Sequence, residues 1–126
     1  MQVKHSGEAQ IRTGEELLQT VLGVRLTSVQ FIMDYLILGF DAKGYLNTYV
    51  WPRLTINGAQ LIFRDVGYRD CLCSLITARV QNLEISAEEE IKIEFENGIN
   101  LDIPLRAYTL PGERAMFTAP KNQLFV

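Results

Sequence analysis

The chain holds very few of the residues that carry out acid–base, nucleophilic or metal chemistry. Its 126 residues include one histidine and two cysteines. A general base or an activated nucleophile at neutral pH usually depends on a histidine beside a second reactive group, so a single histidine excludes most such schemes. That residue, His5, lies in a polar N-terminal stretch, where we expect it to be solvated. One histidine and two cysteines also cannot make an ordinary zinc site.

The sequence lacks the short motifs that bind phosphates and nucleotides or that present a serine nucleophile. It contains no Gly-x-x-x-x-Gly-Lys-Ser/Thr loop, no Gly-x-Gly-x-x-Gly turn and no Gly-x-Ser-x-Gly elbow. Cys71 and Cys73 are two residues apart in a predicted helix and point to different sides, which disfavours a disulfide between them. These absences favour a protein that is not an enzyme, and we assign no catalytic residue, cofactor or metal ion.

An excess of positive charge and long apolar runs are also missing. The formal net charge of −3 gives no reason to expect binding to nucleic acid, which calls for a basic patch. No apolar run approaches the roughly 20 residues of a membrane span, and Met1–Gln10 has no apolar signal-peptide core. We therefore expect a cytoplasmic protein that binds neither nucleic acid nor membrane.

What the sequence does contain fits one globular domain with a core of its own. The chain is 48% hydrophobic and 21% charged, which is ordinary for a soluble domain of 126 residues. We predict a single domain over residues 1–126, in which residues 1–10 form a flexible arm.

A β-hairpin over Val29–Trp51 is the feature around which the rest of the chain is organised. Two runs of apolar, β-branched and aromatic residues flank a short polar turn. A three-residue loop at residues 42–44 would place Phe40 opposite Leu46, with Gly44 in the left-handed position. This register is predicted because a slip of one residue would expose a whole apolar set.

Four aromatic residues gather on one face of this hairpin: Tyr35, Tyr45, Tyr49 and Trp51. One interpretation of this face is a binding surface. The other interpretation is a core layer beneath a helix, which the apolar character of both hairpin faces favours. Asp34 lies within the apolar run beside these residues, where a charged carboxylate calls for a β-bulge, a satisfied buried hydrogen bond or a functional role.

Two helices are predicted from capping signals and apolar periodicity. The first covers residues 13–22, begins with a capping box at Thr13 and ends at Gly23. The second covers residues 66–77 and is capped by Asp65. The apolar stripes comprise Leu17, Leu18, Val21 and Leu22 in the first helix, and Tyr68, Cys71, Leu72, Leu75 and Ile76 in the second.

Two further hairpins are predicted from their turns. The Asn-Gly pair at residues 57–58 predicts a tight hairpin with Ile56 opposite Ala59. A three-residue loop at residues 96–98 predicts another, in which the alternating apolar residues share one face and Lys92 lies opposite Asp102.

The remaining segments complete the predicted fold. We predict strands at residues 79–86 and 121–126, a weak strand at 10–12 and one helical turn at 113–117. Together these elements indicate an α+β fold, with a mainly antiparallel, twisted sheet of about six to eight strands in hairpins and two helices.

Three function classes follow from these features. The first is a small, bacterial-type protein-interaction domain of the inhibitor or immunity-like kind. The alternative is a small-ligand binding module with a pocket between the aromatic hairpin face and a helix. The third is an enzyme that uses a pair of carboxylates, either Asp34 with Asp41 or Asp102 with Glu113.

The C-terminal residues predict a second copy of the chain as a partner. Leu124, Phe125 and Val126 end the sequence without a charged side chain after Lys121. An apolar edge strand here would invite symmetric pairing, so we expect a homodimer. The alternative is a monomer in which Phe125 docks on its own sheet.

Overall fold

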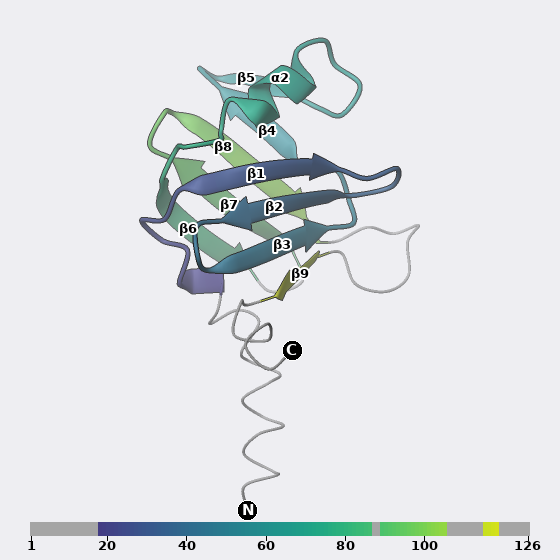
Figure 1. Ribbon diagram of the computed structural model, residues 1–126. Coiled ribbons are helices and arrows are strands. Elements are labelled where there is room, and N and C mark those ends of the chain that lie inside the picture. The colour runs from purple at the N-terminus through teal and green to yellow at the C-terminus, as the bar shows by residue number, and fades with distance from the viewer. Residues whose placement is uncertain (1–17, 87–88, 106–114, 119–126) are drawn as a thin grey trace, which may run out of the picture.

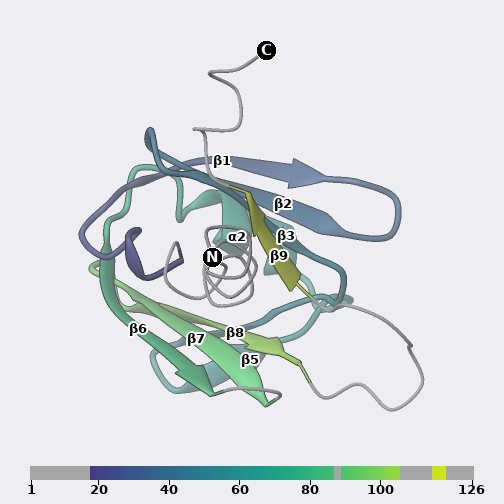
Figure 2. The same ribbon diagram turned by 90° about the horizontal axis from the view of Figure 1, so that it is seen from below.

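Two antiparallel β-sheets lie face to face in this protein (Figures 1 and 2). The structure is a computed structural model that describes residues 18–86, 89–105 and 115–118. Its elements are β1 (Leu26–Phe31), β2 (Leu36–Phe40), β3 (Gly44–Thr48), β4 (Arg53–Ile56), β5 (Ala59–Leu61), α2 (Tyr68–Cys73), β6 (Val80–Ser86), β7 (Glu90–Phe95), β8 (Ile99–Pro104) and β9 (Ala115–Thr118).

The strands divide into a sheet of four and a sheet of five. The first has the order β1-β2-β3-β9 and the second the order β5-β4-β8-β7-β6. The short helix α2 contacts β1 of one sheet and β4 of the other, and it closes one end of the sandwich (Figures 1 and 2). The prediction of a mainly antiparallel fold is confirmed. The prediction of one sheet with six to eight strands is wrong, because the described residues form nine strands in two sheets.

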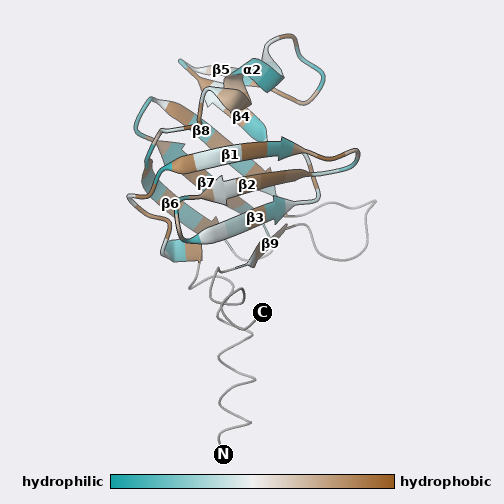
Figure 3. Cartoon of the chain, in the orientation of Figure 1, coloured by the Kyte–Doolittle hydropathy of each residue, from teal (hydrophilic) through white to brown (hydrophobic). Residues whose placement is uncertain are grey.

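The core lies between the two sheets and follows from the alternation along each strand. Strand side chains point to opposite faces in turn, so every second residue faces inward. Figure 3 shows this alternation as brown and teal bands along the strands. The buried residues of the central strands are Leu36, Leu38 and Phe40 in β2, Ile91, Ile93 and Phe95 in β7, and Ile99, Leu101 and Ile103 in β8. Burying each such side chain contributes about 1.5–3 kcal/mol.

The two hairpins predicted from their turns are confirmed. In the β7–β8 hairpin Ile93 pairs with Leu101, and Gly98 has a φ of 90° in the loop. In the β4–β5 hairpin Ile56 pairs with Ala59. Its turn residues Asn57 and Gly58 have φ values of 52° and 82°, as a type I′ turn requires.

The predicted register of the β2–β3 hairpin is wrong by two residues. Phe40 pairs with Gly44, so the loop is 41–43 and Ala42 takes a positive φ of 58°. Because the shift is two residues, every side chain stays on its predicted face. The observed register places Gly39 opposite Tyr45, whose Cε1 would lie 3.2 Å from a Cβ at position 39. The Ser28 hydroxyl of β1 lies closer still to that position, so a side chain at residue 39 would clash with both neighbouring strands.

The first strand of the predicted Val29–Trp51 hairpin is in fact two strands, β1 and β2. Ile32 and Tyr35 exchange both backbone hydrogen bonds, at 2.8 and 3.2 Å, around a two-residue turn of Met33 and Asp34. The chain reverses there, and β1 pairs with β2 in an antiparallel manner. This additional reversal makes β1 a separate strand at the edge of the four-stranded sheet.

The second predicted helix exists, and the side predicted to be apolar is buried. Its bounds are Tyr68–Cys73 instead of the predicted 66–77. Tyr68, Leu72 and Leu75 are buried. The helix begins later than predicted because Gly67, at a φ of 90°, occupies the N-cap position. The Asp65 carboxylate accepts a hydrogen bond from the Ile62 N–H at 2.8 Å and so closes the preceding turn instead of capping the helix.

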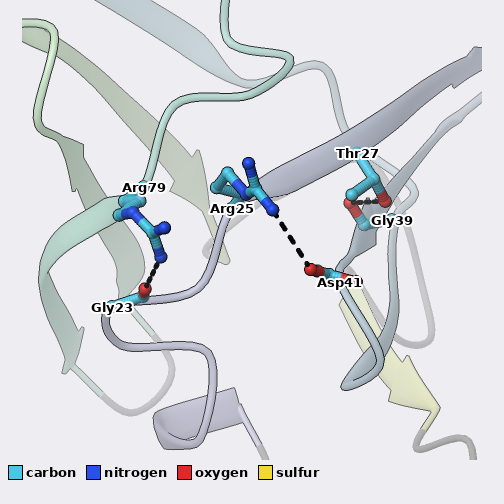
Figure 4. A network of polar contacts seen from close by, with 6 residues as sticks. All are labelled: Gly23, Arg25, Thr27, Gly39, Asp41 and Arg79. Carbon is cyan, nitrogen blue, oxygen red and sulfur yellow. Dashed lines mark hydrogen bonds and ion pairs between the residues drawn. The ribbon is translucent and has the colours of Figure 1, made fainter.

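The first half of the first predicted helix, residues 13–17, lies outside the described residues, which include its second half. Leu18 and Val21 are buried as predicted, whereas Leu22 is 51% exposed. Gly23 has the predicted left-handed φ, at 82°. Its carbonyl accepts a hydrogen bond from Arg79 Nη1 at 3.1 Å, in the polar network of Figure 4. That network also contains an ion pair of 3.8 Å between Arg25 and Asp41.

The segment before the C-terminus differs from the prediction. Residues 115–118 form β9 and pair with β3, whereas a helical turn was predicted for residues 113–117. Ala115 lies opposite Thr48 and Phe117 opposite Leu46, so their alternation fits the inner face of the sheet. The predicted arm at 1–10, the strand at 10–12 and the edge strand at 121–126 lie outside the described residues. Within the described ranges, no helix has the length and apolar character to span a membrane.

The left-handed residue of the β7–β8 turn gives a direct test of the fold. Gly98→Val should lower the free energy of unfolding by about 1–3 kcal/mol, because a β-branched residue at a φ of 90° is strained. Asn97→Ala, the control in the same loop, removes only a hydrogen bond from the Ile99 N–H to Asn97 Oδ1. Urea unfolding measures both, and equal losses would mean that the turn is wrongly placed.

Candidate functional site

The four aromatic residues predicted to form one surface are separated in the structure. Tyr35 and Tyr49 are half-buried neighbours, with ring centroids 5.2 Å apart. Tyr45, 40% exposed, lies in β3 on the outer face of its sheet, opposite Gly39. Trp51 is half-buried and stacks on Phe63, with ring centroids 4.1 Å apart. The set therefore divides between the outer sheet face and the closed end of the sandwich.

Asp34, the candidate functional carboxylate, is exposed at the tip of the β1–β2 turn. The prediction that a β-bulge or a buried hydrogen bond accommodates Asp34 is wrong, because Asp34 lies between β1 and β2 and not within a strand. Asp34 and Asp41 sit at opposite ends of β2, roughly 20 Å apart at the usual rise of a strand. That separation is too great for two carboxylates that act on one bond. Glu113, the proposed partner of Asp102, lies outside the described residues.

Charged side chains from four neighbouring strands form a row across the outer face of the five-stranded sheet. Directly paired residues alternate in sign along it: Glu84 with Lys92, Lys92 with Asp102, and Asp102 with Arg53. Glu90 lies 3.8 Å from Arg53 and 3.7 Å from Lys92. Cross-strand pairs of opposite charge stabilise a sheet by roughly 0.2–1 kcal/mol each. This row is explained by sheet stability.

Asp102 is the carboxylate in this row whose acidity is altered. Partial burial, followed by the negative charge of Glu90, raises the pKa of Asp102, while Lys92 and Arg53 oppose that shift. A raised pKa in a cleft would suggest a general acid. Asp102 instead lies in a row of paired charges on a sheet face.

Both cysteines lie in α2. No group of three or more histidine, cysteine or acidic side chains in the described part of the chain could hold a metal ion. Cys71 and Cys73 are both free thiols, as predicted from their spacing. Burial raises the pKa of Cys71, which favours the protonated thiol over the thiolate.

The most distinctive surface lies at the closed end of the sandwich, around Arg69. The Arg69 guanidinium carbon is 5.8 Å from the ring centroid of Phe31 in β1 and 5.6 Å from that of Phe63 in the segment before α2. Exposed apolar residues adjoin both rings in the sequence, since Ile32 and Met33 follow Phe31, and Ile62 precedes Phe63. We call this set the Arg69 surface; it comprises Phe31, Ile32, Met33, Ile62, Phe63, Val66 and Arg69.

The geometry of the Arg69 surface follows from two turns. The tight turn at Met33 leaves that side chain 89% exposed, next to Ile32. The loop before α2 leaves Val66 98% exposed, because Gly67 redirects the chain into the helix. Arg69 connects the two segments through cation–π contacts, which contribute about 0.5–1 kcal/mol at exposed sites.

An open hollow of about 420 Å³ lies beside the Arg69 surface. Its lining residues are Phe63, Arg64, Asp65, Val66, Gly67, Arg69 and Asp70. Two arginines and two aspartates line it, so its charges balance. Trp51 is not among the lining residues, and the predicted pocket between the aromatic hairpin face and a helix does not coincide with this hollow.

Sequence reasoning assigned none of the Arg69 surface to a site. Phe31 and Met33 were placed inside a long strand, and Val66 inside a helix. The length of the predicted strand could have indicated the turn at Met33, since a strand from Val29 to Asp41 would be about twice as long as common strands.

Comparison with protein-family models, with curated proteins and with solved structures finds no match for this chain.

The raised pKa of Asp102 gives a prediction about stability. The folded protein favours the acid form, so this stabilisation is complete below the ordinary pKa of 3.8 and is lost as pH rises through the higher folded value. Asp102→Asn should lack this dependence. The free energy of unfolding of the wild type minus that of Asp102→Asn should therefore fall as pH rises above 3.8.

Urea unfolding from pH 3.5 to 7 measures this difference. A difference that rises with pH would contradict the prediction and would mean that Lys92 and Arg53 stabilise Asp102 as a carboxylate.

Proposed function

We propose that this chain is a non-enzymatic protein-interaction domain, of the inhibitor or immunity-like kind, that binds another protein through the Arg69 surface. One observation carries the proposal. Eight large apolar side chains are exposed among the described residues, and five of them belong to this surface. They are Phe31, Ile32, Met33, Ile62 and Val66.

The composition of the Arg69 surface supports a protein partner. Soluble proteins seldom leave contiguous apolar patches exposed unless a partner or ligand covers them. Aromatic residues, methionine and arginine are enriched at the centres of protein interfaces. Arg69 has its guanidinium between two aromatic rings, which orders it before a partner arrives and lowers the entropy lost on binding.

We also propose that the protein is cytoplasmic and binds neither nucleic acid nor membranes. We place the protein in the cytoplasm, because its two cysteines are free thiols and a reducing compartment keeps thiols free. The formal net charge of −3 supports neither nucleic acid nor an anionic membrane as a partner.

A small-ligand binding module is the second candidate function, and the hollow beside α2 is what favours it. Arg64 and Arg69 would bind an anionic group there, whereas Asp65 and Asp70 oppose one. Native mass spectrometry of the purified chain distinguishes the two candidates. A stoichiometric small molecule that Arg64→Ala releases would favour this second function.

Affinity capture with surface variants tests the proposed function. Three baits are used in an extract of the cells that make the protein. They are the wild type, the double variant Met33→Asp/Val66→Asp and the control Leu22→Asp. Leu22 is 51% exposed and lies outside the Arg69 surface, so the control introduces one negative charge elsewhere. Wild type and control should retain the same protein, and the double variant should lose it more than about tenfold.

Circular dichroism and urea unfolding of the three baits show whether each is folded. Capture of the same proteins, in the same amounts, by all three folded baits would contradict the proposal.

A further inference from the structure

Among the described residues, the outer side of β1 is an unpaired sheet edge for most of its length. At the start of the strand, the Leu26 N–H donates to the Ala78 carbonyl at 2.9 Å, and the Thr77 N–H donates to the Leu26 carbonyl at 2.7 Å. A register shift between Leu26 and Ser28 follows. From Ser28 to Phe31, no described residue pairs with the side of the strand that faces away from β2.

The hydrogen-bond pattern shows which backbone groups face this open edge. Ile32 and Tyr35 exchange two hydrogen bonds, so they form a hydrogen-bonded pair. Pairs alternate along an antiparallel ladder, so Gln30 directs its N–H and C=O toward β2. Val29 and Phe31 then direct theirs away from β2, toward solvent.

β1 also lacks the features that usually protect an edge strand. Proteins shorten such strands, place charges or proline on them, or interrupt them with bulges. In the five-stranded sheet, β5 has only three residues, and β6 carries Glu84 and a register shift at its start. β1 has six residues, LTSVQF, with no charge and no proline, and its register shift lies at the end that is already paired.

We propose that two copies of this chain pair along β1, antiparallel, about a two-fold axis at Gln30. Val29 of each copy then lies opposite Phe31 of the other, and these two pairs make four backbone hydrogen bonds. The two four-stranded sheets join into one continuous sheet of eight strands. The pairing is self-complementary, because the two outward-facing residues are equally distant from Gln30 along the strand.

The side chains of β1 favour a second copy as the occupant of this edge. Figure 2 shows α2 between the planes of the two sheets. Val29 and Phe31 share the inner face, where Val29 is half-buried and Phe31 is 37% exposed. Pairing places each Phe31 beside the other copy's Val29 and covers both.

This dimer covers Phe31, which also belongs to the Arg69 surface, so it shares one residue with the proposed binding site for another protein. Met33 and Val66 lie outside the paired segment, so the substitutions that test the proposed function leave the β1 edge intact. The dimer contact predicted from residues 121–126 lies outside the described residues, and β1 offers an edge within them.

Charge substitution at the axis tests the dimer. Gln30 is exposed, and the proposed register brings the two Gln30 side chains directly opposite each other, in the close non-hydrogen-bonded arrangement. Gln30→Lys and Gln30→Glu should each weaken the dimer roughly fivefold or more at low salt, because like charges then face each other. An equimolar mixture of the two variants should restore the dimer as a Lys–Glu heterodimer. Gln60→Lys, the control, places the same charge on β5, at the edge of the other sheet.

Light scattering over a concentration series of the full-length chain gives the dissociation constants, and circular dichroism shows that each variant is folded. The proposal requires a wild-type dimer that Gln60→Lys retains. A monomeric wild type would overturn it. It would also fail if the two Gln30 variants dimerised as well as the wild type, or if their mixture dimerised no better than either variant alone.

Discussion

The packing of one apolar sheet face against the other is the interaction on which the rest of the structure depends. Leu38 from one sheet, and Ile93 and Leu101 from the other, are completely buried. Because side chains alternate along a strand, the same pattern that fills the core fixes the outer faces. One outer face carries the alternating row of charges, and the other carries the ring of Tyr45 over Gly39. The helix α2 closes one end of the core, and the exposed Arg69 surface lies around it.

The sequence predicted the parts of the fold that local chemistry determines. The turns at Asn57-Gly58 and Gly98 were placed correctly, because a positive φ is inexpensive only for glycine and a few polar residues. The β2–β3 turn was misplaced because Ala42 takes a left-handed φ of 58° inside the loop, while Gly39 makes room for Ser28 and Tyr45. Those contacts are between strands and depend on a pairing that local preferences do not specify.

The candidate site could not be predicted in the same way. Arg69 meets Phe31 and Phe63 only after the chain has reversed at Met33 and again before α2. Those reversals have weak local signals, since Met33-Asp34 is not a typical turn sequence and an apolar run can belong to one strand or to two. Asp34 was predicted to lie inside an apolar strand. It lies instead in the exposed Met33-Asp34 turn, where its carboxylate is not buried. The same reversal exposes the apolar residues that support the proposed function.

The claim that the two sheets share a single core is tested most directly by amide hydrogen exchange, measured residue by residue in increasing urea. With a single core, the central strands β2 and β7 lose their slowest-exchanging amides in one cooperative unfolding event, with the same free energy and the same dependence on urea. Sheets that were not packed on each other would give two separate transitions, one for each sheet. That result would contradict the account.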